Sequence, residues 1–330
     1  MRKGLIISGV LIWLSAGAQA WGQERRAEYI PLLKAAKLED AWQKAQTALA
    51  QDGCKAEALL VKSELLLERS GDNLDEHLTQ AEKCAAQDSK NSMRQETLGL
   101  AYGAKAMSGM MAGMRYAGKS RDALSHALEL DPKNMGARKA LFMYYLMAPG
   151  IAGGSHEKAR ILADDCQKVD PAGAAMLHTL LLMEEKKPYD KAFSQIMAQP
   201  GADYEHQILQ LMVFNSAGQT LLEQKKFSDA EAVFKRAAEF YPEHEFGNYG
   251  LGRVRQEQGQ FAQALPFFEK AGQLNPRNAR VWMRTGQTLQ ALGGQSQRAI
   301  AAFEKALALK PGLNKKMREQ AQEALRSLKG

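Results

Sequence analysis

Apolar and polar positions recur along this chain with the period of an α-helix, and no stretch shows the two-residue alternation of a strand. Six of the ten prolines stand just after such a helical stretch, where proline ends a helix without breaking one: Pro132, Pro171, Pro200, Pro242, Pro276 and Pro311. The pattern predicts paired helices over 24–52, 55–88, 91–131, 135–170, 173–199, 203–241, 245–275 and 279–310, and a terminal helix over 314–328. We therefore expect an all-α protein.

The last third of the chain repeats one pattern three times, at a period of about 34 residues. Gly218, Gly252 and Gly286 stand in the first helix of each pair, where the second helix must come close. Each second helix has two alanines on either side of a phenylalanine: Ala230, Phe234 and Ala237, then Ala264, Phe268 and Ala271, then Ala299, Phe303 and Ala306. Small residues let two helices approach, and the aromatic ring fills the space between them. A period of this length predicts a stacked helical array.

An array of this kind forms one domain, because each pair packs only on its neighbours and the chain needs no single large core. No Ser-, Gly- or Pro-rich linker divides the chain. Residues 21–330 are therefore predicted to form one solenoid. Its helix pairs are irregular over 24–199 and regular over 203–313, and residues 314–328 cap its end.

These residues closely resemble the tetratricopeptide repeat. The three carboxy-terminal copies match its pattern, and earlier pairs match in part, through Leu98-Gly99-x-x-Tyr102 and the run from Ala127 to Pro132. The resemblance covers roughly residues 25–313. It implies a right-handed superhelical solenoid of about eight helical hairpins with a carboxy-terminal capping helix. It also implies that the first helix of each hairpin lines a concave face that holds a peptide or a partner helix.

The register of that family places its groove-facing positions on Asn215, Gln219, Tyr249, Arg253, Met283 and Gln287. Family members that clamp a carboxy-terminal carboxylate carry a Lys/Asn set at these places, and this chain does not. The mixture found here suits a polar peptide contact with an aromatic anchor. The alternative is that these are ordinary solvated positions.

The first twenty residues have the form of a secretory signal. Arg2 and Lys3 precede an apolar stretch of about 14 residues, shorter than the roughly 20 that span a bilayer as a helix. Ala18-Gln19-Ala20 is a small-x-small cleavage site. We expect cleavage after Ala20 and export to a bacterial periplasm, with no transmembrane segment in the mature chain.

Three cysteines are present, and two of them can pair in an oxidising compartment. Cys54 precedes the first helix of its hairpin and Cys84 lies near the end of the second, so antiparallel packing brings them together. The alternative is that Cys84 is a buried free thiol in a small-residue place, as is expected of Cys166. Cysteine and histidine spacings match no metal site, so no metal ligands are predicted.

Charge gives no reason to expect nucleic acid as a partner. The chain carries a formal net charge of +7. Without the signal it is less basic, and the excess gathers in residues 310–330, at the capping helix. A nucleic-acid binder would instead spread a basic stripe with aromatic residues along one face.

Two motifs imitate catalytic ones. Gly113–Ser120 satisfies GxxxxGK[ST], but a helix precedes it where a phosphate loop needs a strand, so a turn with Ser120 capping the next helix is expected. Ser155-x-x-Lys158 resembles the serine motif of penicillin-binding enzymes without its companion motifs, so Ser155 is expected as a helix cap.

Both motifs lie at turns where the hairpin carries extra residues. The turn of the third hairpin is rich in methionine, and the turn of the fourth is rich in glycine. Methionine is an adaptable contact residue. These turns form either a contact surface or an elongated first helix with its methionines buried: Met107, Met110, Met111 and Met114.

The sequence as a whole favours a non-catalytic scaffold that binds a protein or peptide in the cell envelope. No catalytic residue and no cofactor is predicted. The alternatives are a structural oligomer in which copies pack on one another, and an envelope enzyme or its accessory subunit.

Overall fold

The computed structural model describes residues 26–35, 37–66, 73–309 and 312–330, so the predicted signal sequence lies outside the described residues. Within them the chain forms 17 α-helices, one short 3-10 helix and no strand. The helices are α2 (Ile30–Lys34), α3 (Leu38–Gln51), α4 (Ala56–Leu66), α5 (Leu74–Gln87), α6 (Ser92–Ala106), α7 (Met110–Leu130), α8 (Met135–Met147), η2 (Gly150–Ala152), α9 (His156–Cys166), α10 (Pro171–Glu184), α11 (Asp190–Ile196), α12 (Tyr204–Glu223), α13 (Phe227–Phe240), α14 (Glu245–Glu257), α15 (Phe261–Leu274), α16 (Ala279–Leu292), α17 (Ser296–Ala308) and α18 (Lys315–Lys329).

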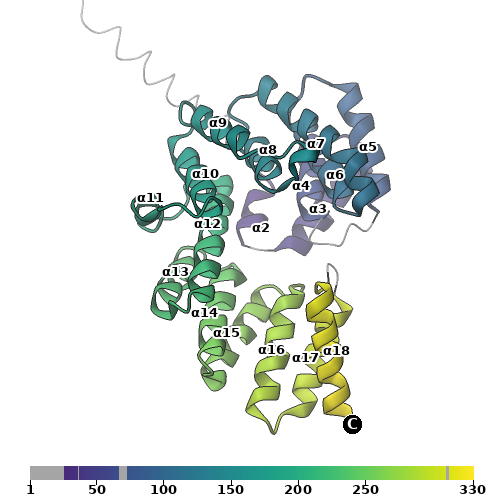
Figure 1. Cartoon of the computed structure of the whole chain (residues 1–330). Helices are drawn as coiled ribbons and strands as arrows, with labels where there is room; N and C mark the ends of the chain where they lie inside the picture. Colours follow the sequence, from purple (N-terminus) through teal and green to yellow (C-terminus); the bar gives the residue numbers. More distant parts are fainter. Residues whose placement is uncertain (1–25, 36, 67–72, 310–311) are drawn as a thin grey trace, which may run out of the picture.

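Successive helices pair and each pair packs on the next, so the predicted all-α solenoid of eight hairpins and a capping helix is confirmed. Figure 1 shows the path curving from α3–α7 through α8–α12 to α13–α15, and then back beneath the first hairpins with α16–α18. The short helix α2 contacts both α3 and α12, and lies between α12 and the first hairpins. No helix within the described ranges is both long and apolar enough to cross a bilayer.

Glycine under an aromatic ring sets the spacing of the regular hairpins, as the sequence predicts. A Cβ atom added to Gly252 would lie 2.7 Å from Cε1 of Phe268. One added to Gly286 would lie 2.9 Å from Phe303, and Gly218 faces Phe234 in the same way. Real side chains do not approach so closely, so only glycine permits this helix spacing.

The turns that end the first helices also require glycine. Gly259 has φ +74° and Gly293 has φ +69°, a backbone conformation that favours glycine. The glycine-rich turn of the fourth hairpin is tighter still. A Cβ atom on Gly154 would collide with the carbonyl oxygen of Ala148, and Gly153 has φ +94°.

The third hairpin differs from the prediction at its turn. Its extra residues lengthen the second helix, so α7 has 21 residues and begins at Met110. Ser120 therefore lies inside α7 and does not cap it; its hydroxyl donates to the carbonyl oxygen of Gly99 at 2.7 Å. The expected turn over Gly113–Ser120 is thus wrong, because this glycine-containing segment continues the helix.

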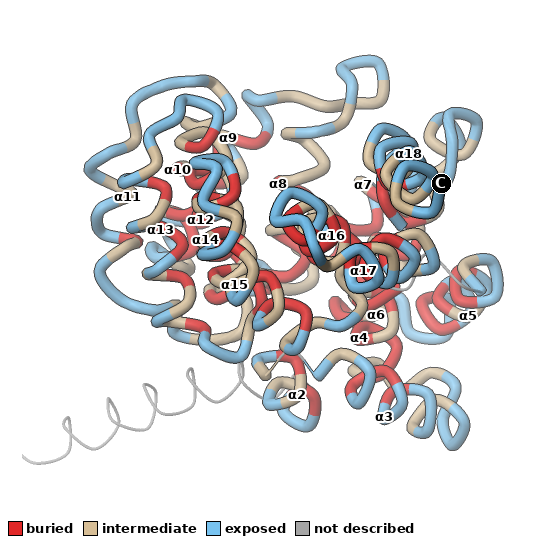
Figure 2. Tube along the Cα trace, turned by 90° about the horizontal axis from the view of Figure 1, so that it is seen from below, coloured by how far each residue is buried: buried red, intermediate tan, exposed pale blue. Residues whose placement is uncertain are grey.

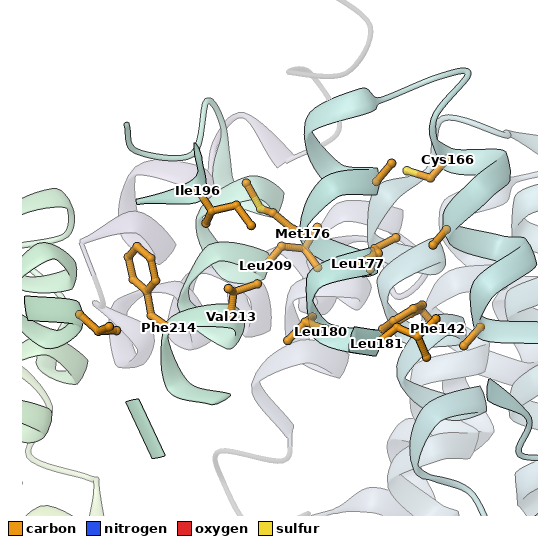
Figure 3. Packing of buried hydrophobic residues seen from close by; sticks show 14 of the residues in the cluster. Phe142, Cys166, Met176, Leu177, Leu180, Leu181, Ile196, Leu209, Val213 and Phe214 are labelled. Carbon is orange, nitrogen blue, oxygen red and sulfur yellow. The ribbon is translucent and has the colours of Figure 1, made fainter. Parts of the chain in front are cut away.

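Buried apolar side chains form a chain of clusters along the array, as expected when each hairpin packs on its neighbours. Figure 2 shows buried stretches within the helices and exposed turns between them. One cluster joins α8 to α13, and Figure 3 shows Leu177, Leu209 and Val213 between its two ends, Phe142 and Phe214.

Replacing Gly252 with Leu should push α14 and α15 apart and lower the free energy of unfolding by roughly 1–3 kcal/mol. Because hairpins couple to their neighbours, amide hydrogen exchange should quicken in α12–α17 and stay slow in α4–α6. Gly118→Leu is the matched control, since Gly118 is also helical but has only Arg121 Nη2 within 4.0 Å of an added Cβ. Equal loss of protection along the whole chain would contradict array-like coupling.

Candidate functional site

The first helices of the three regular hairpins, α12, α14 and α16, lie next to one another and carry the predicted groove positions. Asn215 is exposed, and Gln219, Tyr249, Arg253 and Gln287 are half-buried. We call these five residues the helix-A face. They are available for contact, whereas the sixth predicted position is not.

Met283 is fully buried, with 0% of its surface exposed. It packs in the cluster that joins α16, α17 and α18, with Ala279, Leu289 and Phe303. Its inclusion in the predicted groove is therefore corrected. The family register fixes the position on the helix, but this apolar side chain is covered by the last helices of the array.

Arg253 is the main charge of the helix-A face. Its guanidinium donates to Oε1 of Gln219 at 2.6 Å, which links α14 to α12. Burial lowers the pKa of Arg253, and the charges of Glu257 and Glu223 only partly oppose that shift. Among the described residues no carboxylate forms a direct ion pair with it. The ring of Tyr249 lies 6.0 Å from that of Phe268, so the tyrosine is braced by the same phenylalanine that packs on Gly252. The face thus combines a braced aromatic ring with a half-buried positive charge that has no direct ion pair among the described residues.

A buried ion cluster joins the start of the described chain to the middle of the array. Arg26 donates to Glu64 of α4 and to Glu205 of α12, and it also lies over the ring of Tyr204 at 5.5 Å from the ring centroid. Lys139 of α8 approaches the second oxygen of Glu205 at 2.6 Å. Arg26 and Glu205 are 179 residues apart, so helical periodicity gave no signal for this contact.

A third carboxyl group in this region, that of Glu96, is fully enclosed. Asn134 caps α8 with its Oδ1 and donates from Nδ2 to Glu96 Oε2 at 2.9 Å. Burial raises the pKa of Glu96 to about 7, although Arg26 opposes the shift. The region therefore holds two cations and three acids away from solvent, which ties the segment before α2 to α4, α6, α8 and α12.

His206 links two helix starts. Its Nδ1 lies 2.8 Å from Asp203, which caps α12, and its Nε2 lies 3.0 Å from Asp170, which caps α10. Hydrogen bonds to Asp170 and Asp203 raise the pKa of His206 to about 10, so the ring is a cation at neutral pH and donates from both nitrogens. Nothing in the local sequence pattern distinguishes this histidine from the others.

Ser63 and His77 form a buried pair, with Oγ and Nε2 2.7 Å apart. Burial lowers the pKa of His77 to about 4, so the ring is neutral. A neutral histidine beside a serine is the start of a nucleophilic pair, but His77 is 0% and Ser63 3% exposed, and a substrate cannot reach them. The pair is a buried polar contact between α4 and α5, in which Nδ1 of His77 has no hydrogen-bond partner within the described part of the chain.

Cys54 and Cys84 are joined by a disulfide bond, with their Cα atoms 5.3 Å apart. A loop of this length stabilises the fold by roughly 3–4 kcal/mol on the chain-entropy estimate. Cys166 is a buried free thiol, and burial raises its pKa to about 11, so it is unreactive.

The two imitating motifs form no site. Gly113–Ser120 lies inside α7, where its backbone N–H groups are used in helix hydrogen bonds and cannot hold a phosphate. Ser155 caps α9 as predicted, accepting from the N–H of Lys158 at 3.2 Å. Within the described part of the chain, no three His, Cys, Asp or Glu side chains are placed to hold a metal ion.

The methionines of the third hairpin are exposed, with 71–82% of their surface accessible: Met107, Met110, Met111 and Met114. The expectation of an elongated first helix with buried methionines is therefore wrong. The extra turn of helix belongs to α7, and no neighbouring helix within the described residues covers it.

Comparison with known protein families identifies the regular part of the array. Residues 249–314 match the family model of the tetratricopeptide repeat. This part of the chain is similar to tetratricopeptide repeats, and it includes Tyr249, Arg253 and Gln287 of the helix-A face. No curated protein matches the chain.

Solved structures share the solenoid fold at low sequence identity. Yeast Tom70 is 15% identical with a TM-score of 0.53, and the match covers 83% of this chain and 64% of that one. The APC/C hetero-tetramer Cut9-Hcn1 gives 13% identity and a TM-score of 0.48, over 93% of this chain and 56% of that one. A tetratricopeptide repeat protein of Parabacteroides merdae is 15% identical with a TM-score of 0.42, and the match covers 93% of this chain and 98% of that one. This chain thus spans 64% of the length of Tom70 and 56% of the length of the Cut9-Hcn1 chain. The likeness to Tom70 shows the fold alone.

The charge on His206 should make stability depend on pH. Its folded pKa of about 10 lies above the unfolded value of 6.5, so its stabilisation is complete below pH 6.5 and is lost as the pH rises towards 10. We expect the urea midpoint to fall between pH 6.5 and pH 9 in the wild type, and much less in His206→Gln. His126→Gln removes an exposed histidine and should keep the wild-type dependence. The same pH dependence in His206→Gln would contradict this assignment.

Proposed function

We propose that the protein is an exported, non-catalytic scaffold that binds a protein or peptide on the concave helix-A face of its carboxy-terminal repeats. The observation that carries this proposal is that Tyr249 and Arg253, one helical turn apart on α14, are both half-buried on a face built by three adjacent first helices. Tyrosine and arginine supply much of the binding energy at protein interfaces, because one gives a large rigid contact and the other a directed charge.

The charge of Arg253 narrows the class of partner. Among the described residues no carboxylate forms a direct ion pair with it, and burial disfavours its charge more than Glu257 and Glu223 favour it. An acidic side chain of a bound peptide would supply the missing partner, while Gln219 and Asn215 would bind peptide backbone groups. The proposed ligand is therefore an extended or helical segment with an acidic residue beside an apolar one.

The proposed location is the periplasm, after cleavage behind Ala20. The form of residues 1–20 supports it, and a disulfide between Cys54 and Cys84 fits an oxidising compartment. Mass spectrometry of the protein isolated from an exporting host should find a chain that begins at Trp21. A mature chain that retains Arg2 and Lys3 would contradict cleavage.

Tyr249→Ala should weaken partner capture by more than about 1 kcal/mol, a several-fold loss, and leave the helical signal unchanged. The assay places a photo-crosslinking residue at exposed Asn215 and identifies the captured protein by mass spectrometry. Exposed Lys235 on the second helix α13 is the control position, and it should not capture the same protein.

A second pair of variants tests the charge. Arg253→Gln should lower capture from position 215, whereas Arg255→Gln should not, because Arg255 lies two residues on and is paired with Glu231. Equal effects of these two substitutions, or equal capture from positions 215 and 235, would show that the helix-A face is not the binding surface. Self-capture alone would favour the structural oligomer.

A further inference from the structure

The turns of the third and fourth hairpins expose large apolar side chains that the proposed peptide-binding face does not use. Beside the four methionines at the end of α6 and the start of α7, Met147 is 72% exposed and Ile151 is fully exposed. We call these six residues the methionine surface: Met107, Met110, Met111, Met114, Met147 and Ile151. Elsewhere among the described residues, the exposed large apolar side chains are Ile161 and Leu292, at 51% and 37%. Such a concentration on a folded protein marks a contact surface.

The two turns lie close to each other. The 3-10 helix η2, which contains Ile151, contacts α7. Gly153 lies beside Arg121 of α7, so close that an added Cβ would be 3.2 Å from Arg121 Nη1. Met114 precedes Arg121 by two helical turns, about 10 Å along the helix axis. The two groups of apolar side chains therefore belong to one edge of the array.

This edge carries several cations. Residues 97–121 contain two lysines and two arginines and no acidic residue, and two of the four are paired with acids outside this stretch, Lys105 with Asp75 and Arg121 with Asp122. Arg115 and Lys119 have no ion pair within the described ranges, and lie over the rings of Tyr116 and Tyr102. Lys158, at the start of α9, similarly lies over Tyr145. Unpaired cations thus border the methionine surface on both of its turns.

We propose that the methionine surface docks on an anionic lipid bilayer. Side chains that are 71% to 101% exposed protrude from the molecule and do not line a groove, whereas a partner helix or peptide would need a groove to receive it. A bilayer accepts protruding apolar groups among its acyl chains, while Arg115, Lys119 and Lys158 reach the phosphate level. The same positive charge disfavours a soft metal cation on the thioethers. This surface lies on other helices than the helix-A face, so the two proposals stand independently.

The test is flotation of the purified protein with vesicles of equal parts phosphatidylglycerol and phosphatidylcholine, compared with phosphatidylcholine alone. We expect a partition coefficient at least tenfold higher on the anionic vesicles, falling as salt is raised. Met110→Ser/Met111→Ser/Met114→Ser should lower it at least tenfold, because each serine removes an inserted apolar chain. Arg115→Gln/Lys119→Gln should lower it by about fivefold per cation and weaken its salt dependence.

Leu292→Ser is the control, since Leu292 is a partly exposed apolar residue at the opposite end of the chain, and it should leave partitioning unchanged. Circular dichroism and the urea midpoint should match the wild type in every variant, because the replaced side chains are exposed. Any contribution of residues 1–25 is common to all variants and cancels. Equal partitioning of the wild type and the triple methionine variant, or no binding to anionic vesicles, would overturn the proposal. So would loss of a crosslinked protein partner in that variant without any vesicle binding, which would make the surface a protein-docking site.

Discussion

The close approach of two helices over a glycine is the contact on which the regular part of this fold depends. Gly218, Gly252 and Gly286 each receive the ring of the phenylalanine sixteen or seventeen positions later in the same hairpin. Because the ring is clamped on one side by backbone, its position is fixed, and with it the distance between the paired helices. The face formed by α12, α14 and α16 inherits its regular spacing from these three contacts.

The same ring shapes the binding face that we propose. Phe268 packs on Gly252 on one side and lies 6.0 Å from the ring of Tyr249. A residue that sets helix spacing thus also holds the proposed aromatic anchor. Rigid support of this kind lowers the entropy that a contact residue loses on binding. In this hairpin the helix spacing and the position of the proposed aromatic anchor therefore depend on the same residue, Phe268.

Much of the fold could be predicted from the sequence, because its determinants are local and periodic. Gly259 and Gly293 at helix ends and Ser155 as a cap follow from neighbouring residues alone. The candidate site was predictable only in part. Whether Met283 stays on the surface depends on α17 and α18 packing beside it, and the family register does not contain that information.

The features that could not be predicted are contacts between segments far apart in the chain. The hydrogen bond to Asp170 helps keep His206 protonated, and Arg26 is held in position by ion pairs with Glu64 and Glu205. Each of these residues is unremarkable in its own helix. The methionines of α7 were noticed in the sequence, but their exposure depends on which helix of the hairpin was lengthened. The periodicity of hydrophobic positions does not show which of the two helices is longer or whether the methionines are buried, since methionine occurs both in cores and at contact surfaces.

The ion cluster around Arg26 has a consequence for the order in which the chain folds. In a purely local array, the first hairpin is complete as soon as its own residues have emerged. Here the ion pair between Arg26 and Glu205 cannot form until Glu205 has been synthesised, 179 residues later. Closing so long a loop is slow and entropically unfavourable until the intervening hairpins have folded and brought the ends together. The segment around Arg26 thus reaches its final position only after the hairpins between it and Glu205 have folded.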